Sequence, residues 1–198
     1  MERRGLAMST VVLDVSVSLD GFTTGPNVRE TEPMGDGGER LHEWMAGKGP
    51  DGEVDAGVRR DTDATVGATI IGRRTFDLGL GPWGGTPWPG VPSFVVTHQA
   101  RQNNLLGDNG GTFVFDGLEA AARRARDAAG DKDVLVLGAN VARQLLRAGL
   151  LDEVRIHVVP LLMGDGTPLF AGEQAELIPT GKPVAGSVTH LRYRILKP

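Results

Sequence analysis

The chain has 198 residues, with 21 Lys and Arg against 25 Asp and Glu, and its formal net charge is −4. This length suits a single domain, and the mildly acidic balance argues against a dedicated nucleic-acid-binding protein, which usually carries a basic excess. The absence of cysteine excludes disulfides, thiolate metal sites, iron–sulfur clusters and a cysteine nucleophile. The 29 glycines follow no three-residue period, so we expect them at tight turns and where the backbone approaches a ligand.

The N-terminal residues 1–9 predict a disordered tail. They begin with the basic run MERRGLA, but no apolar segment follows before Asp14, which argues against a signal peptide. No segment approaches the ~18 consecutive apolar residues of a membrane span. We therefore expect a cytoplasmic protein without a membrane partner, folded as one domain over residues 10–198.

Strands and helices are predicted to alternate along most of the chain. Apolar, β-branched runs predict strands at residues 10–19, 65–71, 93–97, 112–115, 134–137, 154–159 and 188–196. Helices are predicted at residues 39–46, from Asp116 to a stop at Gly130, and at residues 140–148 before Gly149. Asp116 and Glu119 form a capping-box pattern for the second of these helices. The order favours an α/β fold with a mixed, mostly parallel sheet and an antiparallel C-terminal strand pair.

Three segments give weaker signals. Residues 22–38 predict a long loop, residues 48–61 are polar without clear periodicity, and residues 79–92 are rich in Gly and Pro. Residues 79–84 spell G-x-G-x-x-G, but the prolines that follow exclude the helix that a dinucleotide fingerprint requires. His42-Glu43 lacks the second histidine of a zinc-protease motif, and the four histidines have no ligand spacing, so we expect no metal site.

Three predicted strands end in groups that bind phosphate. Gly138, Ala139 and Asn140 open a helix after strand 134–137, where free N–H groups and the positive helix end meet. Strand 65–71 runs into Gly72, Arg73, Arg74 and Thr75, and strand 93–97 ends in Thr97 and His98. Because ligands bind outside the carboxyl ends of strands in open α/β sheets, the three ends together favour a phosphorylated ligand. The alternative interpretations are plain strand-to-helix turns and a solvated cationic turn.

Polar residues on the first strand are candidate catalytic groups. Asp14 and Ser16 are two residues apart and so share one face of the strand, and Asp20 follows the strand. A buried carboxylate on an apolar strand is energetically costly, which marks Asp14 as functional. The alternative is an aspartate that is hydrogen-bonded to backbone amides.

An ordered set of segments resembles the dihydrofolate reductase-like superfamily, in the branch that holds the reductase domain of riboflavin biosynthesis. They are SLDGF at residues 18–22, IGRRTF at 71–76, FVVTH at 94–98, VLVLGAN at 134–140, AGLLDEV at 148–154 and PLLMGDG at 160–166. The resemblance implies a three-layer α/β/α fold and a homodimer. It implies an NADPH-dependent reductase of a small heterocycle or ribosylamino-pyrimidine, similar to 5-amino-6-(5-phosphoribosylamino)uracil reductase.

The resemblance also implies roles for individual residues. Val15 and Ser16 would line the nicotinamide, Arg73, Arg74 and Thr75 after Gly72 would hold phosphates, and Thr97 and His98, with Arg101, would face the adenosine 2′-phosphate. The pyrophosphate would be wrapped by Gly138, Ala139, Asn140, Val141 and Ala142. Catalytic candidates are Asp14, Ser16 and Asp20, and Glu39 and Trp44 are assigned to the substrate. Asp20, Gly21 and residues 24–38 would form a mobile flap.

Two positions depart from the family pattern. The family commonly has Gly-Gly, often with a cis peptide, where this chain has Gly138-Ala139. True dihydrofolate reductases carry an acidic residue on the helix after the flap, where this chain has Arg40. The missing acidic residue argues against folate reduction, and dihydrofolate or pterin reduction is the alternative to pyrimidine reduction. A flavin-binding reductase and a non-catalytic dinucleotide-binding protein on the same fold are two further hypotheses.

Overall fold

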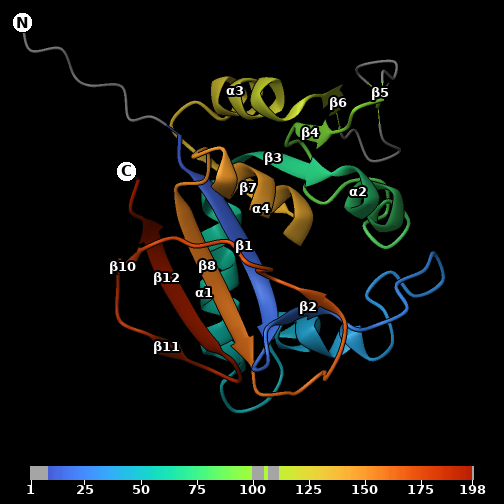
Figure 1. The fold of residues 1–198 in the computed structure, drawn as a ribbon. Coiled ribbons are helices and arrows are strands. Elements are labelled where there is room, and N and C mark those ends of the chain that lie inside the picture. The colour runs from blue at the N-terminus through green and yellow to red at the C-terminus, as the bar shows by residue number, and fades with distance from the viewer. Residues whose placement is uncertain (1–8, 100–104, 107–111, 198) are drawn as a thin grey trace, which may run out of the picture.

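The centre of the fold is a mixed, mostly parallel sheet (Figure 1). The computed structural model describes residues 9–99, 105–106 and 112–197, and in this part of the chain ten strands form that sheet. Its parallel strands, in spatial order, are β8 (Glu153–Val159), β1 (Val11–Ser18), β7 (Asp133–Leu137), β3 (Val66–Gly72), β4 (Ser93–Val96) and β6 (Thr112–Asp116).

Antiparallel strands complete both edges of the sheet. Beyond β8 lie β12 (Thr189–Ile195) and its partners β10 (Leu177–Pro179) and β11 (Val184–Ala185). The other edge is β5 (Leu105–Leu106), and a separate small sheet pairs β2 (Phe22–Thr24) with β9 (Thr167–Pro168). The predicted α/β class, mostly parallel sheet and antiparallel C-terminal strands are confirmed.

Helices cover both faces of the sheet, which gives the expected three layers (Figure 1). On one face lie α3 (Leu118–Ala129) and α4 (Ala139–Arg147), and on the other lie the 3₁₀ helix η1 (Gly38–Ala46) and α1 (Gly52–Thr65). The short helix α2 (Arg73–Gly79) begins directly at the end of β3.

Alternation along β1 divides the buried side chains between the two faces. Val11, Leu13 and Val17 join the main apolar core with the alanine face of α3, whereas Val12 packs on the opposite side with Leu135. Asp14 and Ser16 follow Val12 on that second side and meet α1 and η1. The polar residues of β1 are therefore inside the structure, between the sheet and a helical layer.

Helix α1 is the largest difference from the sequence prediction, which found no clear element at residues 48–61. Beyond Gly52 at its start, its buried positions Asp55, Val58 and Thr62 have helical spacing, but two of these three are polar. Asp55 and Thr62 bond to polar groups of the sheet instead of packing into an apolar core. Because an amphipathic helix is predicted from apolar residues at helical spacing, this polar face gives no helix signal.

The capping-box prediction for α3 is wrong. Asp116 belongs to β6, and its carboxylate accepts a hydrogen bond from the Gly117 N–H at 2.9 Å. The N-cap is Gly117, which no side chain among the described residues caps. The predicted stop is confirmed, since the helix ends at Ala129 and Gly130 has φ 66°.

Residues 80–92, which are all described, form no helix or strand beyond the end of α2, as predicted. Two tryptophans fix this segment. Trp83 lies against Gly79, and Trp88 donates from Nε1 to Asp63 Oδ1 at 3.0 Å while it packs near Val12. The segment therefore covers apolar surface at the side of the sheet, and the G-x-G-x-x-G spelling within it has a packing role.

The N-terminal end of the described residues packs against α3. Residues 1–8, most of the predicted tail, lie outside the described residues, but Ser9 is 5% exposed and its carbonyl accepts a hydrogen bond from Arg126. Among the described residues every peptide bond is trans, including Gly138–Ala139. Within the same ranges, no helix is both long enough and apolar enough to cross a bilayer.

Candidate functional site

The carboxyl ends of β7, β3 and β4 lie next to one another at one edge of the sheet, because these strands are parallel neighbours. Gly72 ends β3, Thr97 and His98 follow β4, and Gly138 follows β7. The structure thus brings together the three segments that the sequence analysis selected for phosphate binding. This is the position in which open α/β sheets bind ligands.

The ends of β3 and β7 fit closely against each other. Gly138 has φ 106°, and a Cβ at this position would lie inside the 3.0 Å limit of real Cβ contacts, against Thr75 Oγ1. A Cβ on Gly72 would meet Val141 at 3.5 Å. The first turn of α4 follows Gly138, and no side chain of the described residues caps it, which suits an anion at this helix end. The Ala142 N–H already donates to the Gly138 carbonyl at 3.1 Å. Ala139, Asn140, Val141 and Ala142 form that turn.

The two arginines at the start of α2 have different partners. Arg73 donates from Nε to both carboxylate oxygens of Asp77, at 2.9 and 2.7 Å, and is held along the helix. Arg74 is exposed and reaches the opposite loop, where its guanidinium donates to the Val28 carbonyl at 3.3 Å. Arg74 is therefore the arginine that joins the strand end to the predicted flap.

A polar hollow of about 260 Å³ opens between α2 and the flap. Arg74 lines one side, and the remaining lining residues come from the flap and from the turn before β9: Gly25, Pro26, Asn27, Val28, Asp165, Gly166 and Thr167. The flap is braced internally by the ion pair of Arg29 with Asp36 at 2.7 Å. Residues 165–167 were not predicted to belong to a ligand site. They reach the hollow only because β9 pairs with β2.

The side chain of Asp20 anchors a turn. Its carboxylate accepts hydrogen bonds from the Ser18 hydroxyl at 2.6 Å and from the N–H groups of Met163 and Gly164. The Ser18 hydroxyl and the Met163 amide, working against a small desolvation effect, lower the pKa of Asp20 to about 2. The carboxylate is therefore ionised at neutral pH, where it can position groups or accept a proton but cannot donate one.

The Asp20 carboxyl is expected to titrate at about pH 2 in an NMR titration of the folded protein. Since its pKa is below the ~3.9 of an unfolded aspartate, its stabilising contribution is complete above pH ~4 and is lost as the pH falls toward ~2. Asp20→Asn should loosen the Met163–Gly164 turn and abolish this contribution, whereas the exposed Asp61→Asn should do neither. Titration of Asp20 near 3.9 would contradict the anchoring role.

Asp14 and Ser16 share a face, as predicted, but protein groups already engage their polar atoms. Asp14 lies 2.9 Å from His157 Nε2 through Oδ1 and accepts from the Thr62 hydroxyl at 3.1 Å through Oδ2. Burial works to raise the pKa of Asp14, but the hydrogen bond and charge of His157, with smaller help from Arg155 and Thr62, outweigh it and lower that pKa. Its partners are side chains, where the alternative interpretation expected backbone amides.

Val15 faces the opposite side of β1, where it packs against the main apolar core. The pairing of β1 with β7 ends at Leu13 and Val136, so Val15 continues past the last paired position, toward the turn at Gly138. A ligand at the end of β7 would therefore lie near Val15.

The two residues assigned to the substrate differ in exposure. Glu39 is exposed in the first turn of η1, whereas Trp44 is 6% exposed and donates from Nε1 to Ser16 Oγ at 2.9 Å. The Trp44 ring lies 4.6 Å from the His157 ring, centre to centre. Trp44 therefore fixes η1 on β1, and Glu39 is the residue of the two that is open to a ligand.

The third strand end carries an exposed histidine. Thr97 continues the sheet through an N–H bond to the Asp116 carbonyl at 2.9 Å, and its hydroxyl accepts from the Gln99 N–H at 3.1 Å. These bonds form a tight turn on which His98 is exposed. Arg101, which the resemblance places nearby, lies outside the described residues.

Comparison with known proteins decides the family. The RibD C-terminal domain matches residues 9–185. The chain belongs to this family. The uncharacterized protein YyaP of Bacillus subtilis strain 168 is 27% identical over 177 residues, which cover 83% of this chain and 82% of YyaP.

Solved structures agree with this fold at low sequence identity. A Shewanella sp. PV-4 protein named for riboflavin biosynthesis matches with a TM-score of 0.72 and 22% identity, covering 96% of this chain and all of that one. A Thermotoga maritima diaminohydroxyphosphoribosylaminopyrimidine deaminase/5-amino-6-(5-phosphoribosylamino)uracil reductase matches with a TM-score of 0.64 and 12% identity. The match covers 96% of this chain but only 57% of that longer chain. The chain is thus a RibD reductase-like domain with the dihydrofolate reductase-like fold, as the sequence resemblance implied.

Proposed function

We propose that this RibD C-terminal domain is an NADPH-dependent reductase of a ribosylamino-pyrimidine. The observation that carries the proposal is the convergence of three anion-binding strand ends beside a polar hollow lined by Arg74. The family is one of pyrimidine reductases, and the Thermotoga relative is named for reduction of 5-amino-6-(5-phosphoribosylamino)uracil. A dinucleotide and a phosphorylated sugar both need several phosphate contacts, which this edge of the sheet offers.

The residues at the three strand ends fit the phosphates of NADPH. The uncapped first turn of α4 and the exposed Arg74 suit the pyrophosphate, with Arg73 and Thr75 behind them. His98, exposed on its turn beside Thr97, suits the 2′-phosphate. Val15 on β1 lies toward the end of β7 and suits the nicotinamide, whereas Ser16 is buried on the other face of the strand, where it accepts from Trp44 Nε1. When bound, NADPH supplies the hydride of the reaction.

The contribution of the chain to reduction would be orientation and exclusion of water. The flap, which is tied to α2 through Arg74 and Val28, can cover the hollow. Glu39 is an exposed carboxylate in the first turn of η1 and can hydrogen-bond a pyrimidine ring. Asp20 is ionised and anchored, so its contribution would be to hold the Met163–Gly164 turn at the end of β1.

Replacing His98 by alanine should raise the KM for NADPH about tenfold and leave the KM for NADH unchanged, because only NADPH carries the 2′-phosphate. Arg74→Ala should raise the KM for both cofactors, since the pyrophosphate is common to them. Steady-state kinetics with each cofactor measures this. Arg60→Ala, at an arginine of α1 with 68% side-chain exposure, is the matched control. Equal effects of His98→Ala on the two cofactors would remove His98 from the 2′-phosphate site.

Turnover is tested with a panel of pyrimidine, pterin and flavin acceptors at saturating NADPH. The proposal expects oxidation of NADPH with a ribosylamino-pyrimidine and none with dihydrofolate. Tight NADPH binding without oxidation by any acceptor would instead identify a non-catalytic dinucleotide-binding protein. Preference for a pterin would reverse the substrate assignment.

We also propose that two copies of the chain associate through the C-terminal end of the sheet. Strand β12 is flanked on both edges, by β8 and by β10 with β11, so its own edge is not free. The apolar side chains Leu177, Ile178 and Val184 on the outer strands are 40%, 36% and 42% exposed. Sedimentation should show a dimer that Ile178→Asp weakens, and a monomeric wild-type chain would refute this proposal.

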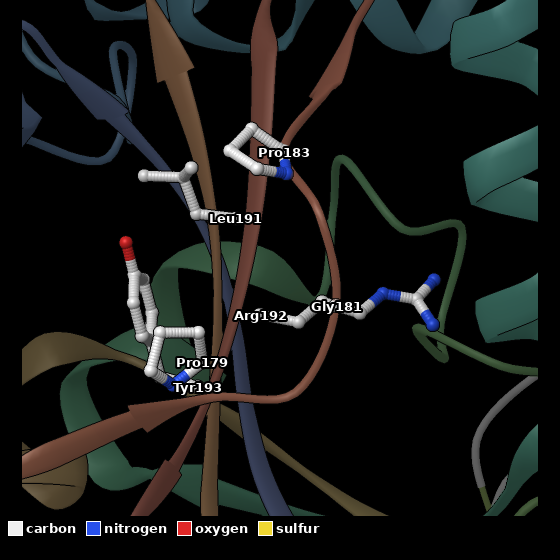
Figure 2. A pocket seen from close by; sticks show the side chains of 6 residues that line it. All are labelled: Pro179, Gly181, Pro183, Leu191, Arg192 and Tyr193. Atoms are coloured by element: carbon white, nitrogen blue, oxygen red, sulfur yellow. The ribbon is translucent and has the colours of Figure 1, made fainter.

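A shallow hollow of about 100 Å³ lies next to these strands, on the other side of β1 from the phosphate-binding ends. Figure 2 shows Leu191 and Tyr193 on one side of β12 and Arg192 on the other. Pro179, Gly181 and Pro183 form the rest of the lining, so the hollow lacks the converging polar groups of a catalytic site. Its position supports a contact between copies of the chain.

A further inference from the structure

Three buried side chains and the half-buried Asp14 form one unbroken chain of hydrogen bonds between the sheet and α1. Asp14 Oδ1 of β1 lies 2.9 Å from His157 Nε2 of β8, and His157 Nδ1 lies 2.7 Å from His190 Nδ1 of β12. His190 Nε2 then lies 3.0 Å from Asp55 Oδ1 of α1. The chain Asp14–His157–His190–Asp55 therefore links three strands and a helix that are distant in sequence.

This chain is shielded from water. His157 and His190 are each 3% exposed and Asp55 is fully buried. The Trp44 ring lies over both imidazoles, with centres 4.6 and 5.1 Å away. Within the described residues no group of three or more histidine or acidic side chains is arranged for a metal ion.

The hydrogen bonds fix how many protons the chain holds. A contact of 2.7 Å between two ring nitrogens requires one proton between them, because two lone pairs or two N–H groups would repel at that distance. Each Asp–His contact also requires one proton. Three consecutive hydrogen bonds therefore need three protons, one more than two neutral histidines and two ionised aspartates carry.

The surroundings disfavour the extra proton on His190. Burial and the charge of His157, against the favourable carboxylates of Asp55 and Asp14, lower the pKa of His190, which disfavours a second proton there. The second carboxylate oxygen of Asp55 accepts hydrogen bonds from the Ser187 N–H and hydroxyl. Asp14 is ionised as described above.

Other charged groups face this chain from its neighbours. Arg155 of β8 lies close enough to act on Asp14, and it is itself paired with Asp133 and Glu153 at 2.8 and 2.7 Å. His42 of η1 is held neutral, since burial and the charge of His157 lower its pKa. The net charge of the four-residue chain is −1, and Arg155 is the cation that faces it.

We propose that Asp14, His157, His190 and Asp55 form a three-proton lock that holds β12 and α1 to the sheet. The lock opens when these four residues together gain or lose one proton. A fourth proton puts N–H groups on both sides of the ring–ring contact, and removal of the third leaves two lone pairs there. Either change breaks the bond between His157 and His190. The inference concerns the folded structure and does not depend on the proposed reductase activity.

The lock makes stability depend on pH in both directions. Histidines in the unfolded chain have pKa values of ~6.5, so well above that pH the unfolded segments hold two protons and well below it they hold four. In the folded protein the group Asp14–His157–His190–Asp55 holds three protons. Stability therefore falls as the pH rises above ~6.5, because folding then requires uptake of a proton, and falls as the pH drops below ~6.5, because unfolding then takes one up. Each limb approaches a tenfold change in the unfolding constant per pH unit.

The proton count can be measured directly. Nitrogen-15 NMR of the histidine rings, assigned with His157→Gln and His190→Gln, reports which ring nitrogens carry hydrogen. At pH 7.5 we expect three protonated nitrogens among the four of this pair. Two or four protonated nitrogens in the pair would overturn the proposal. The variants serve only to assign the signals, and the protonated nitrogens are counted in the folded wild-type protein.

Urea unfolding between pH 5.5 and 8.5 provides the second test. Wild type should be most stable near pH ~6.5, with His42 adding only to the loss on the acid side because its pKa is lowered. His190→Gln removes the need for a third proton and should abolish the alkaline decline, whereas His98→Gln should keep it. A wild-type stability that is flat from pH 6.5 to 8.5 would overturn the lock.

Discussion

Replacing Gly138 by alanine is expected to lower the free energy of unfolding by about 2–3 kcal/mol and to weaken NADPH binding. Two effects add at this position. The backbone has φ 106° and ψ 129°, a region that only glycine adopts without strain. The new Cβ would also overlap the Thr75 hydroxyl, which fills the space beside Gly138. Relief of that overlap must move either the first turn of α4 or the start of α2.

Gly149→Ala separates these two effects. Gly149 also has a positive φ, 67°, but a Cβ there meets nothing within 4 Å among the described residues. We expect about 1 kcal/mol from backbone strain alone and unchanged NADPH binding. The double variant Gly138→Ala with Thr75→Ala should recover part of the stability lost in Gly138→Ala. Purely additive losses in urea unfolding would show that the contact with Thr75 does not matter.

The sequence predicts the site best where backbone conformation carries the signal. Gly72 and Gly138 could be placed at strand ends because an apolar run stops at a glycine and a helix begins. Parallel pairing of the predicted strands then brings the two glycines to one edge of the sheet. The flap hollow could not be predicted, because Asp165 and Thr167 reach it through the pairing of two short strands, β2 and β9.

Side-chain roles on β1 were harder to predict for a different reason. Alternation correctly places Asp14 and Ser16 on one face, but it does not identify what lies opposite that face. Their partners His157 and Trp44 come from distant segments and become neighbours only after the sheet and η1 assemble. His157 and His190 looked scattered in sequence, although antiparallel register sets them directly opposite each other. A search for polar residues at matching positions of neighbouring strands could have found them.

Asp55→Ala is expected to destabilise the protein by about 3–5 kcal/mol. The carboxylate is fully buried, and it accepts from His190 and from the N–H and hydroxyl of Ser187. Truncation leaves these donors unsatisfied in a dry interior and removes one end of the three-proton lock. Asp61→Ala, an exposed position on the same helix, should change stability by less than about 0.5 kcal/mol. Urea unfolding at pH 6.5 compares the two variants.

Gly186 makes the Asp55 prediction sharper, because it packs directly against this carboxylate. A Cβ on Gly186 would overlap Asp55 Oδ1, so Gly186→Ala alone should be strongly destabilising. In the Asp55→Ala background the space is open, and Gly186→Ala should then cost little or even fill part of the cavity. The coupling between the two substitutions should therefore be large and favourable. Additive losses would mean that Asp55 does not lie against Gly186, and a small loss from Asp55→Ala alone would mean that the helix does not depend on this buried contact.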